Sequence, residues 1–319
     1  MKISNILTGI IAVFLLLFII LTFLVYHFLF KANILRKTDT TSNDYGIEIL
    51  RTVNEDSKVY AQWFLEQNPE EIEMTSFDGL KLHAYFLPAP NGAENADATL
   101  LLMHGFHGSG LKDFAIVSKF YHQNNYNVLI PDQRTHGKSE GKYITFGIKE
   151  RFDCHDWTML LNEKLGDDKN IFMDGVSMGC ATVLMACGTD LPPNVKGVIA
   201  DCGFTSPYEI MKHVITQNMH LPAFPIMPVA GMLTKVIAGF GLKEYSATTA
   251  MKNNAIPVLF VHGDADDFVP PYMSEQNYAA CAAPKQLFMV PGAIHAMSYF
   301  TDTPKSQQTI LEFLEKYSK

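Results

Sequence analysis

The sequence contains little cysteine, and its cysteines are not arranged for a metal site or a disulfide framework. The 319 residues include five, scattered along the chain: Cys154, Cys180, Cys187, Cys202 and Cys281. None belongs to a CxxC pair, and no Cys/His cluster has the spacing of zinc ligands. Most lie in apolar stretches, as small buried hydrophobic residues do. We therefore expect no metal, no cofactor and no disulfide framework, which favours a reducing compartment for the domain.

The chain also lacks a strongly basic stretch and any internal repeat. Its net charge is −8, and no stripe of Lys and Arg runs through its body. Binding to nucleic acid depends largely on neutralising phosphates, so we expect no nucleic-acid partner. Apolar residues make up 48% of the chain and charged residues 18%, which is enough for a sizeable core. The length beyond the N-terminal segment suits one large α/β domain or two smaller ones.

The N-terminal segment from Ile6 to Phe30 has no Asp, Glu, Lys or Arg. About twenty apolar residues cross the hydrocarbon core of a bilayer as a helix, so this segment is long enough to span. A cleaved signal peptide is the alternative. Its apolar region normally has only about 7–15 residues, and no small-x-small cleavage site follows Phe30. The sequence therefore predicts a single-pass membrane anchor in the cell membrane.

Positive charge around this segment gives a weak indication of topology. Lys31, Arg36 and Lys37 follow the span, whereas Lys2 and the amino terminus precede it. The positive-inside rule then places the domain on the cytoplasmic side. We divide the chain into an anchor with its flank (1–37), a linker with a lead-in helix (38–70) and one α/β domain (71–319).

The domain begins with alternating apolar and polar residues and continues with uninterrupted apolar runs. EIEMTSFDG and LKLHAYFLPA predict a hairpin around a two-residue Asp78-Gly79 turn. Six apolar runs then predict strands that are buried on both faces: 99–105, 126–132, 170–175, 195–201, 257–263 and 286–292. Helical stretches separate or follow them: 112–123, 149–164, 178–187, 271–283 and 305–317, and 60–67 is a short helix before the domain. This order is typical of a twisted, mostly parallel sheet flanked by helices.

One interval, about 205–252, is too long for a simple crossover. It contains HLPAFPIMPVAGML, in which three prolines within seven residues argue against a second membrane helix. We interpret the interval as an apolar cap over a substrate site, with a membrane-facing patch as the second interpretation.

The pentapeptide Gly175-Val176-Ser177-Met178-Gly179 directly follows one predicted strand and directly precedes a helix. A tight strand-to-helix turn needs small neighbours, and it lifts the serine hydroxyl clear of the sheet edge. The N–H of Met178, at the start of the helix, is placed to stabilise an oxyanion. A close-packed turn without chemistry is the alternative interpretation.

A serine nucleophile needs a base, and the base needs an orienting carboxylate. Among eleven histidines, only His295 follows the last strand, where a loop brings it to the serine. The preceding strand ends in three candidate acids, Asp264, Asp266 and Asp267, and Asp201 follows another strand. We expect Asp201 to stabilise its own loop.

The loop HGFHG (104–108) is expected to supply a second oxyanion donor, the N–H of Phe106. Its two histidines have no third ligand with matching spacing, so we interpret His104 as a packed structural residue and His107 as a rim residue. His262, in a second His-Gly pair, is interpreted as a core residue that fixes its loop.

From about Thr75 to the C-terminus the chain resembles the α/β-hydrolase superfamily. The motifs that carry this resemblance are HGFHG, DQRTHGKSEG, GVSMG, DCGFTSP, HGDADDFVP and GAIHA, in this order. Within the superfamily the chain looks most like membrane-anchored bacterial serine hydrolases of the YqkD-like and S9-peptidase-like group.

The resemblance implies the α/β-hydrolase fold and a triad of Ser177, His295 and Asp266, with Asp267 as the first alternative acid. It implies Phe106 and Met178 as the oxyanion-hole donors. One departure is Thr135, where the family usually has Gly, so the backbone of that loop is expected to differ; Arg134 and His136 are expected to be scaffold residues.

These features predict a serine hydrolase that cleaves carboxylic esters, with a small-molecule ester or a lipid-like molecule as substrate. A peptidase of the S9-like type is the alternative, although such proteins usually carry a propeller domain for which this chain has no room. A membrane-tethered binding protein on a hydrolase fold is a further alternative, because one fold hosts many functions. Such proteins usually lose a triad residue, and here all three positions hold competent side chains.

Overall fold

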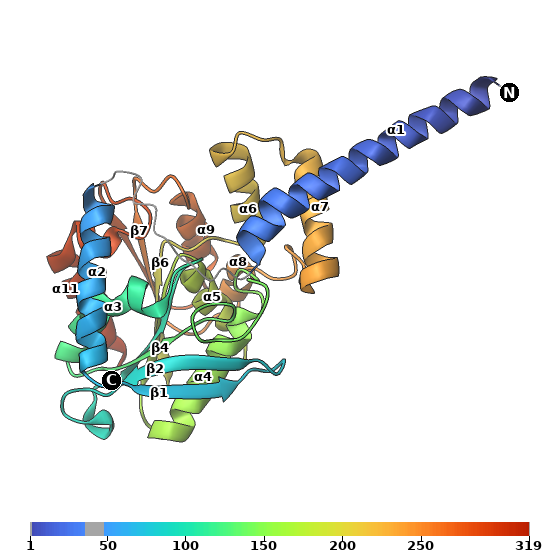
Figure 1. The fold of residues 1–319 in the computed structure, drawn as a ribbon. Helices are drawn as coiled ribbons and strands as arrows, with labels where there is room; N and C mark the ends of the chain where they lie inside the picture. Colours follow the sequence, from blue (N-terminus) through green and yellow to red (C-terminus); the bar gives the residue numbers. More distant parts are fainter. Residues whose placement is uncertain (1, 36–47, 319) are drawn as a thin grey trace.

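The protein is a single eight-stranded sheet with helices on both faces and one long helix that projects from it (Figure 1). The structure, a computed structural model, describes residues 2–35 and 48–318. The strands are β1 (Glu70–Thr75), β2 (Lys81–Leu87), β3 (Thr99–Met103), β4 (Asn127–Pro131), β5 (Ile171–Val176), β6 (Val195–Asp201), β7 (Val258–Gly263) and β8 (Lys285–Val290). Their spatial order is β1-β2-β4-β3-β5-β6-β7-β8. Only β1 and β2 run antiparallel to their neighbours, so the predicted mostly parallel sheet is confirmed.

Two apolar layers cover the sheet. On one face, α4 (Glu150–Leu165), α5 (Met178–Ala186), α8 (Ala247–Met251) and α9 (Tyr272–Ala280) contribute to one core cluster. On the other, α2 (Glu48–Glu66), α3 (Gly110–Gln123) and α11 (Thr303–Tyr317) contribute to a second, and a short α10 (Ser298–Thr301) precedes α11. Strand residues alternate between the layers: Leu101 and Met103 face the first, Leu100 and Leu102 the second. The central strands are apolar on both faces because both faces are covered.

Two local predictions near the N-terminal edge of the sheet need correction. The hairpin loop holds three residues, because the N–H of Ser76 still donates to the carbonyl of Leu80 at 2.8 Å. Gly79 takes a φ of +86° there, which favours glycine. The lead-in helix α2 is longer than the predicted 60–67, since it begins at Glu48. The part of the 38–70 linker before Glu48 lies outside the described residues.

The interval after β6 forms a helical cap. It contains α6 (Pro207–His213), η3 (Val214–Asn218), α7 (Ala223–Leu233) and η4 (Thr234–Ala238). Phe224 interrupts the helical backbone of α7, so the regular helix begins at Pro225, where proline is tolerated. Pro228 lies one turn inside α7, yet the helix continues to Leu233.

The N-terminal segment is helical throughout: α1 (Lys2–Leu24) continues into the π-helix η1 (Val25–Ile34). Asn5–Lys31 is long and apolar enough to cross a membrane, and its most apolar part is exposed. A helix near the N-terminus with these properties is a membrane anchor or a signal sequence. Figure 1 shows α1 leaving the domain beside the cap.

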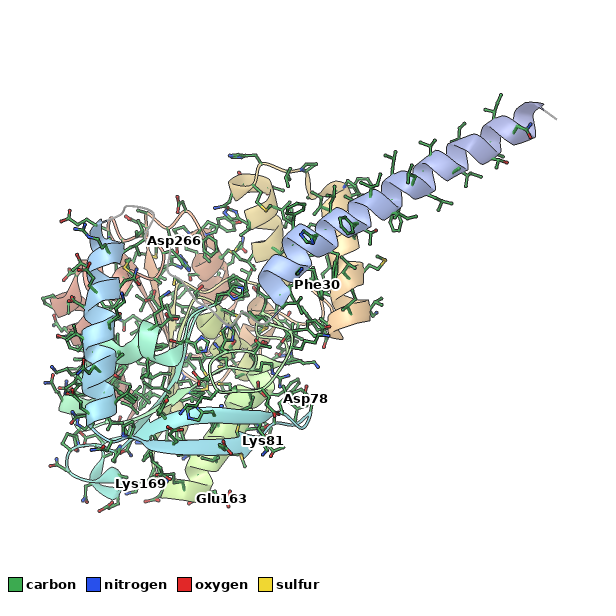
Figure 2. The ribbon with its side chains drawn as sticks, viewed as in Figure 1. Phe30, Asp78, Lys81, Glu163, Lys169 and Asp266 are labelled. Carbon is green, nitrogen blue, oxygen red and sulfur yellow. The ribbon has the colours of Figure 1, made fainter. Side chains whose placement is uncertain are left out.

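The last part of this segment, Val25–Leu35, is packed into the domain, and we call it the anchor foot. Val25, Phe30 and Ile34 are buried in the core cluster that contains the cap helix α7. Figure 2 labels Phe30 where the long helix meets the domain. The carbonyl of Ile34 accepts the N–H of Ile144 at 2.8 Å. The foot is thus part of the core of the domain.

Candidate active site

Ser177 lies in the turn between β5 and α5, at the carboxyl end of the parallel strands. Its φ is +56° and its ψ is −113°, a conformation that non-glycine residues rarely adopt. The turn is tight: a Cβ on Gly175 would lie 2.4 Å from the carbonyl oxygen of Gly179. A Cβ on Gly179 would lie 1.8 Å from the carbonyl oxygen of Met103. Only glycine fits at either position, and the strained turn presents the hydroxyl above the sheet.

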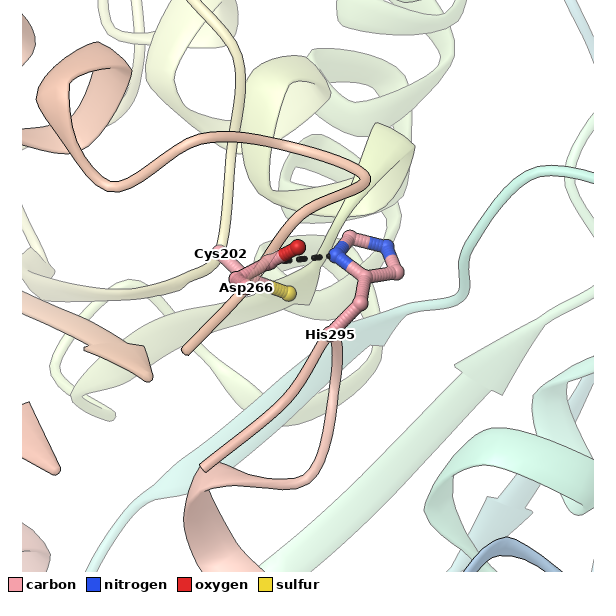
Figure 3. Close-up of side chains that lie close together, drawn as sticks. All are labelled: Cys202, Asp266 and His295. Atoms are coloured by element: carbon pink, nitrogen blue, oxygen red, sulfur yellow. Dashed lines mark hydrogen bonds and ion pairs between the residues drawn. The ribbon is translucent and has the colours of Figure 1, made fainter. Parts of the chain in front are cut away.

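His295 lies between Ser177 and Asp266. Its Nε2 is 2.9 Å from the Ser177 Oγ, and its Nδ1 is 2.7 Å from Oδ2 of Asp266. Since a carboxylate oxygen only accepts, Nδ1 carries the proton and Nε2 is free to accept from the serine hydroxyl. Figure 3 shows the imidazole and the carboxylate joined by this contact. The structure therefore brings together the three residues that the sequence singled out as nucleophile, base and acid.

Asp266 is a buried carboxylate with several hydrogen-bond donors. Its Oδ1 accepts the backbone N–H groups of Phe268 and Val269, and its Oδ2 accepts from His295 and from Nε2 of His262 at 3.1 Å. Burial alone would raise the pKa of Asp266, but the hydrogen bonds from His262 and His295 outweigh it and hold the pKa well below the usual range. Asp266 therefore stays ionised beside the imidazole.

The other candidate acids lie elsewhere. Asp264 is exposed and accepts the N–H of Gly292 at 2.6 Å, and Asp267 is exposed. Asp201 accepts from the Ser298 hydroxyl at 3.1 Å, so its carboxylate contacts the segment that follows His295. Burial raises the pKa of Asp201 to about 6.

The two predicted oxyanion donors flank the serine. Met178 opens α5, where the first N–H groups have no intrahelical acceptor. Phe106 lies in the loop after β3, and a Cβ on its neighbour Gly105 would lie 3.6 Å from the Cβ of Ser177. The Phe106 ring stacks on Phe146 at 5.3 Å between centroids.

Asp113 fixes the loop that carries Phe106, a role that sequence reasoning missed. Its Oδ2 accepts the N–H of Gly105 at 2.8 Å. A Cβ on Gly108 would come within 2.4 Å of the same oxygen, so the carboxylate is enclosed by the loop. Burial raises the pKa of Asp113 above its usual range. Asp113 lies on α3 with no motif of its own, so only the fold reveals this contact.

The remaining histidines of the motifs are structural. His104 is fully buried; its Nδ1 donates to the carbonyl of Gly105 at 2.8 Å and its Nε2 accepts the N–H of Gln133. Burial lowers the pKa of His104. His262 is fully buried too, and its Nε2 also donates to the carbonyl of Val269 at 2.8 Å. Its contact with the predicted catalytic acid was not anticipated. His107 is half-buried.

The loop with Thr135 keeps the conformation that glycine favours. Its φ is +71°, in the left-handed region that favours glycine. Thr135 is buried and its N–H donates to the carbonyl of Glu140 at 2.9 Å. The adjacent Arg134 is a buried scaffold residue that forms paired hydrogen bonds with Asp153 and with Asp78.

One group of potential metal ligands lies at the site. Among the described residues, Cys202, Asp266 and His295 place one ligand atom each within 4.8 Å of one another (Figure 3). Burial raises the pKa of the Cys202 thiol well above its usual range, which disfavours the thiolate that metal binding requires. The Asp266 and His295 atoms already bond within the triad, so we interpret the group as part of that network.

A small cavity of about 50 Å³ lies beside the triad, and its mostly apolar walls include three carboxyl groups. Asp113, Asp174 and Asp201 line it together with Val176 and Ala296, the neighbours of Ser177 and His295. Drug-sized ligands occupy roughly 300–1,000 Å³, so this cavity suits a few water molecules rather than a substrate.

Comparison of the sequence with known proteins shows the family to which the chain belongs. The family profile described as alpha/beta hydrolase fold matches residues 98–230. The Bacillus subtilis protein YqkD is 30% identical over 251 residues, which cover 77% of this chain and 81% of YqkD. The chain belongs to the alpha/beta hydrolase fold family.

Other relatives and solved structures agree with this membership. YfhR of Escherichia coli K12 is 28% identical over 244 residues, or 75% of this chain and 77% of YfhR. A structure of the Pyrococcus furiosus esterase Pf2001 has a TM-score of 0.63 at 21% identity and covers 80% of this chain and 95% of its own. Est1E of Butyrivibrio proteoclasticus, solved with ferulic acid bound, has a TM-score of 0.57 at 20% identity and covers 77% and 98%. At such identities the likeness to solved structures shows the fold alone.

Proposed function

We propose that this chain is a membrane-anchored serine hydrolase that cleaves carboxylic esters through an acyl-enzyme. The observation that carries the proposal is the position of His295, with one ring nitrogen 2.9 Å from Ser177 and the other 2.7 Å from Asp266. The esterases among the structural neighbours support an ester as the substrate.

The reaction begins when the Ser177 oxygen attacks the ester carbonyl carbon and its proton passes to Nε2 of His295. Asp266 accepts from Nδ1 and stabilises the imidazolium that forms. The N–H groups of Phe106 and Met178 stabilise the negative charge that develops on the carbonyl oxygen. A single such donor contributes on the order of 10²–10³ in rate.

Collapse of the tetrahedral intermediate breaks the bond to the leaving alcohol, which takes the proton from His295. The acyl group remains on Ser177 as an ester. A water molecule then repeats the sequence: His295 removes its proton, the water oxygen attacks the acyl carbon, and the carboxylic acid leaves as Ser177 regains its proton.

Labelling with a fluorophosphonate probe tests the nucleophile. We expect the wild-type chain to react and Ser177→Ala to lose both labelling and about 10⁴-fold or more of its esterase rate. Ser206→Ala is the matched control, because Ser206 caps α6 outside the site. This variant should still be labelled at Ser177. Labelling of a folded Ser177→Ala variant at the wild-type level would refute the assignment.

A substrate panel tests the reaction. We expect turnover of p-nitrophenyl esters to exceed that of aminoacyl amides by orders of magnitude, because the amide leaving group is poorer. Amide turnover comparable with ester turnover would instead favour a peptidase.

The anchor foot supports an uncleaved anchor over a signal sequence. Cleavage at the end of the N-terminal segment would remove Val25, Phe30 and Ile34 from the core, where each is at most 6% exposed. We therefore propose a single-pass protein of the cell membrane, and the positive flank favours a cytoplasmic domain. Mass spectrometry of the N-terminal peptide from membranes tests this: a mature chain that begins after the foot would contradict it.

A further inference from the structure

The cap exposes a group of large apolar side chains, which we call the cap patch. It consists of Met219, Leu221, Phe224, Met232, Val236 and Ile237. Phe224 is 78% exposed and Val236 is 77% exposed. Scattered exposed apolar residues are ordinary, but a group gathered on one short segment marks an interaction surface.

The cap patch adjoins the anchor. The buried foot residues Val25 and Phe30 share one core cluster with Met227, Val229 and Leu233 of the same helix α7. Just before the foot, α1 presents the exposed Phe23, and within the foot η1 presents the exposed Phe28. Figure 1 shows α1 passing beside α7 as it leaves the domain. The apolar surface of the anchor therefore continues onto the cap.

The length of the cap's apolar helix indicates how it meets a bilayer. The apolar stretch Ala223–Ala238 is shorter than the approximately 20 residues that a spanning helix needs. It carries one charge, Lys235, whose long side chain reaches a polar surface while its stem stays apolar. Such a helix suits the boundary between headgroups and acyl chains.

Charge on the cap fits an anionic lipid surface. The interval 205–252 holds four lysines and two glutamates, which gives a net charge of +2. The whole chain has −8, so the remainder carries −10. Acidic residues are thus sparse in the segment with the exposed apolar residues, and the small net positive charge that results suits an anionic membrane surface.

We propose that the cap patch lies in the interfacial layer of the bilayer that holds α1, and that the site takes an amphiphilic ester from this bilayer. The proposal rests on the proposed esterase function and names its substrate class. Apolar rings near the site suit an acyl chain: Phe268 is 39% exposed, with its ring 5.0 Å from that of His295. The foot reaches the segment beside the oxyanion loop, since the Phe30 ring lies 5.6 Å from that of Tyr143, and Phe146 of the same segment stacks on Phe106.

Depth-dependent quenching tests the position of the cap. The full-length chain with Cys187→Ser, which removes the single half-buried cysteine, is labelled with a fluorophore at Val236→Cys or at Val59→Cys. Val59 is a matched control because it is 66% exposed on α2, across the domain from α7 (Figure 1). In vesicles that contain phosphatidylglycerol, we expect nitroxide lipids to quench the label at 236 severalfold more than the label at 59.

Equal quenching at the two sites would overturn the proposal. The proposal would also be overturned if the nitroxide lipids did not quench the label at 236 and its fluorescence changed with the number of protein molecules per vesicle. A second copy of the chain would then cover the patch.

Activity provides the second test. In the reconstituted full-length chain, we expect Val236→Asp to lower kcat/KM about 10-fold for a long-chain ester in the vesicle and to leave hydrolysis of soluble p-nitrophenyl acetate unchanged. Val59→Asp should change neither rate. An unchanged rate on the vesicle ester, with soluble activity retained, would refute the bilayer proposal alone. A wild-type chain inactive on both esters would refute the esterase function itself.

Discussion

Two adjacent aspartates show how much the position of a single carboxylate decides. Asp266 is buried and accepts from His295, whereas Asp267 is exposed. Both side chains are chemically identical, and they follow the same strand. Only Asp266 can hold the imidazole in the tautomer whose Nε2 accepts from Ser177.

We therefore expect Asp266→Asn to lower kcat by about 10³–10⁴-fold, because an amide would favour the wrong imidazole tautomer. Asp267→Asn is the matched control and should retain the wild-type kcat. Steady-state kinetics on a soluble ester measure both. A larger loss of kcat in Asp267→Asn than in Asp266→Asn would instead identify Asp267 as the acid of the triad.

His262 supports the acid at the oxygen that also accepts from His295, since its Nε2 donates to Oδ2 of Asp266 at 3.1 Å. We expect His262→Ala to lower kcat about 10-fold with little change in KM, because it removes one donor from Asp266 without touching the substrate. His262→Gln keeps a donor and should recover part of kcat. A change confined to thermal stability, with kcat intact in both variants, would reduce His262 to a packing residue.

Buried carboxyls make stability depend on pH. Asp174 lies in β5 and accepts from the Tyr121 hydroxyl at 2.6 Å, and burial raises its pKa to about 7. The folded state thus binds this proton more tightly than the unfolded state, whose carboxyl has a pKa of about 3.9. The stabilisation is complete below the unfolded pKa and is lost as the pH rises through about 7.

We expect Asp174 to contribute a loss of about 2 kcal/mol of folding stability between pH 5.5 and pH 8, and Asp174→Asn to reduce the pH dependence by that amount. The exposed Asp168→Asn variant should behave as wild type. Chemical denaturation in detergent at both pH values measures the difference. Stability that rises with pH in the wild type would contradict the assigned direction.

At the scale of elements, the foot of the first helix belongs to the hydrolase core. Phe30 is 2% exposed, whereas Phe28, two residues earlier, is 63% exposed. We expect Phe30→Ala to destabilise the domain by about 3 kcal/mol and Phe28→Ala to have little effect in detergent. Similar denaturation midpoints for the two variants would show that the foot does not pack as described.

Truncation separates the span from the foot. We expect a chain that begins at Val25 to keep the hydrolase domain folded and active on soluble esters. A chain that begins at Leu35 should aggregate, because it exposes the apolar side chains of α7 that Val25, Phe30 and Ile34 cover. Size-exclusion chromatography and esterase assays compare the two, and equal solubility and activity would contradict the role of the foot.

At the scale of the whole molecule, the sequence predicted the order of elements and the residues that meet at the site. Uninterrupted apolar runs such as 257–263 report burial on both faces, and therefore a parallel sheet with its carboxyl ends at one edge. That edge collects Ser177, Asp266 and His295. Position along the chain was enough to find Ser177 and His295. It left Asp264, Asp266 and Asp267 open as the acid, and only the family resemblance selected Asp266.

Contacts between distant elements were not predictable in this way. Two examples are the hydrogen bond from the Gly105 N–H to Asp113 and the hydrogen bond from His262 to Asp266. Both depend on how loops fold over one another. Asp174 did leave a signal, since a carboxylate within the apolar run NIFMDG needs a buried partner. Packing of the foot on α7 was hidden because α7 is apolar on all sides, so it shows no face that marks its neighbour.

Four rings connect the anchor with the oxyanion loop: Phe30 touches Tyr143, and three residues further on Phe146 stacks against Phe106. A span that is longer or shorter than the surrounding hydrocarbon tilts to match it. Such a tilt would act first on Phe30 and then, through the aromatic contacts, on the backbone that is to hold the substrate's carbonyl oxygen. If the chain is the membrane-anchored esterase proposed above, lipid thickness would be a mechanical input to the rate of ester cleavage, one that an assay in detergent micelles would not register.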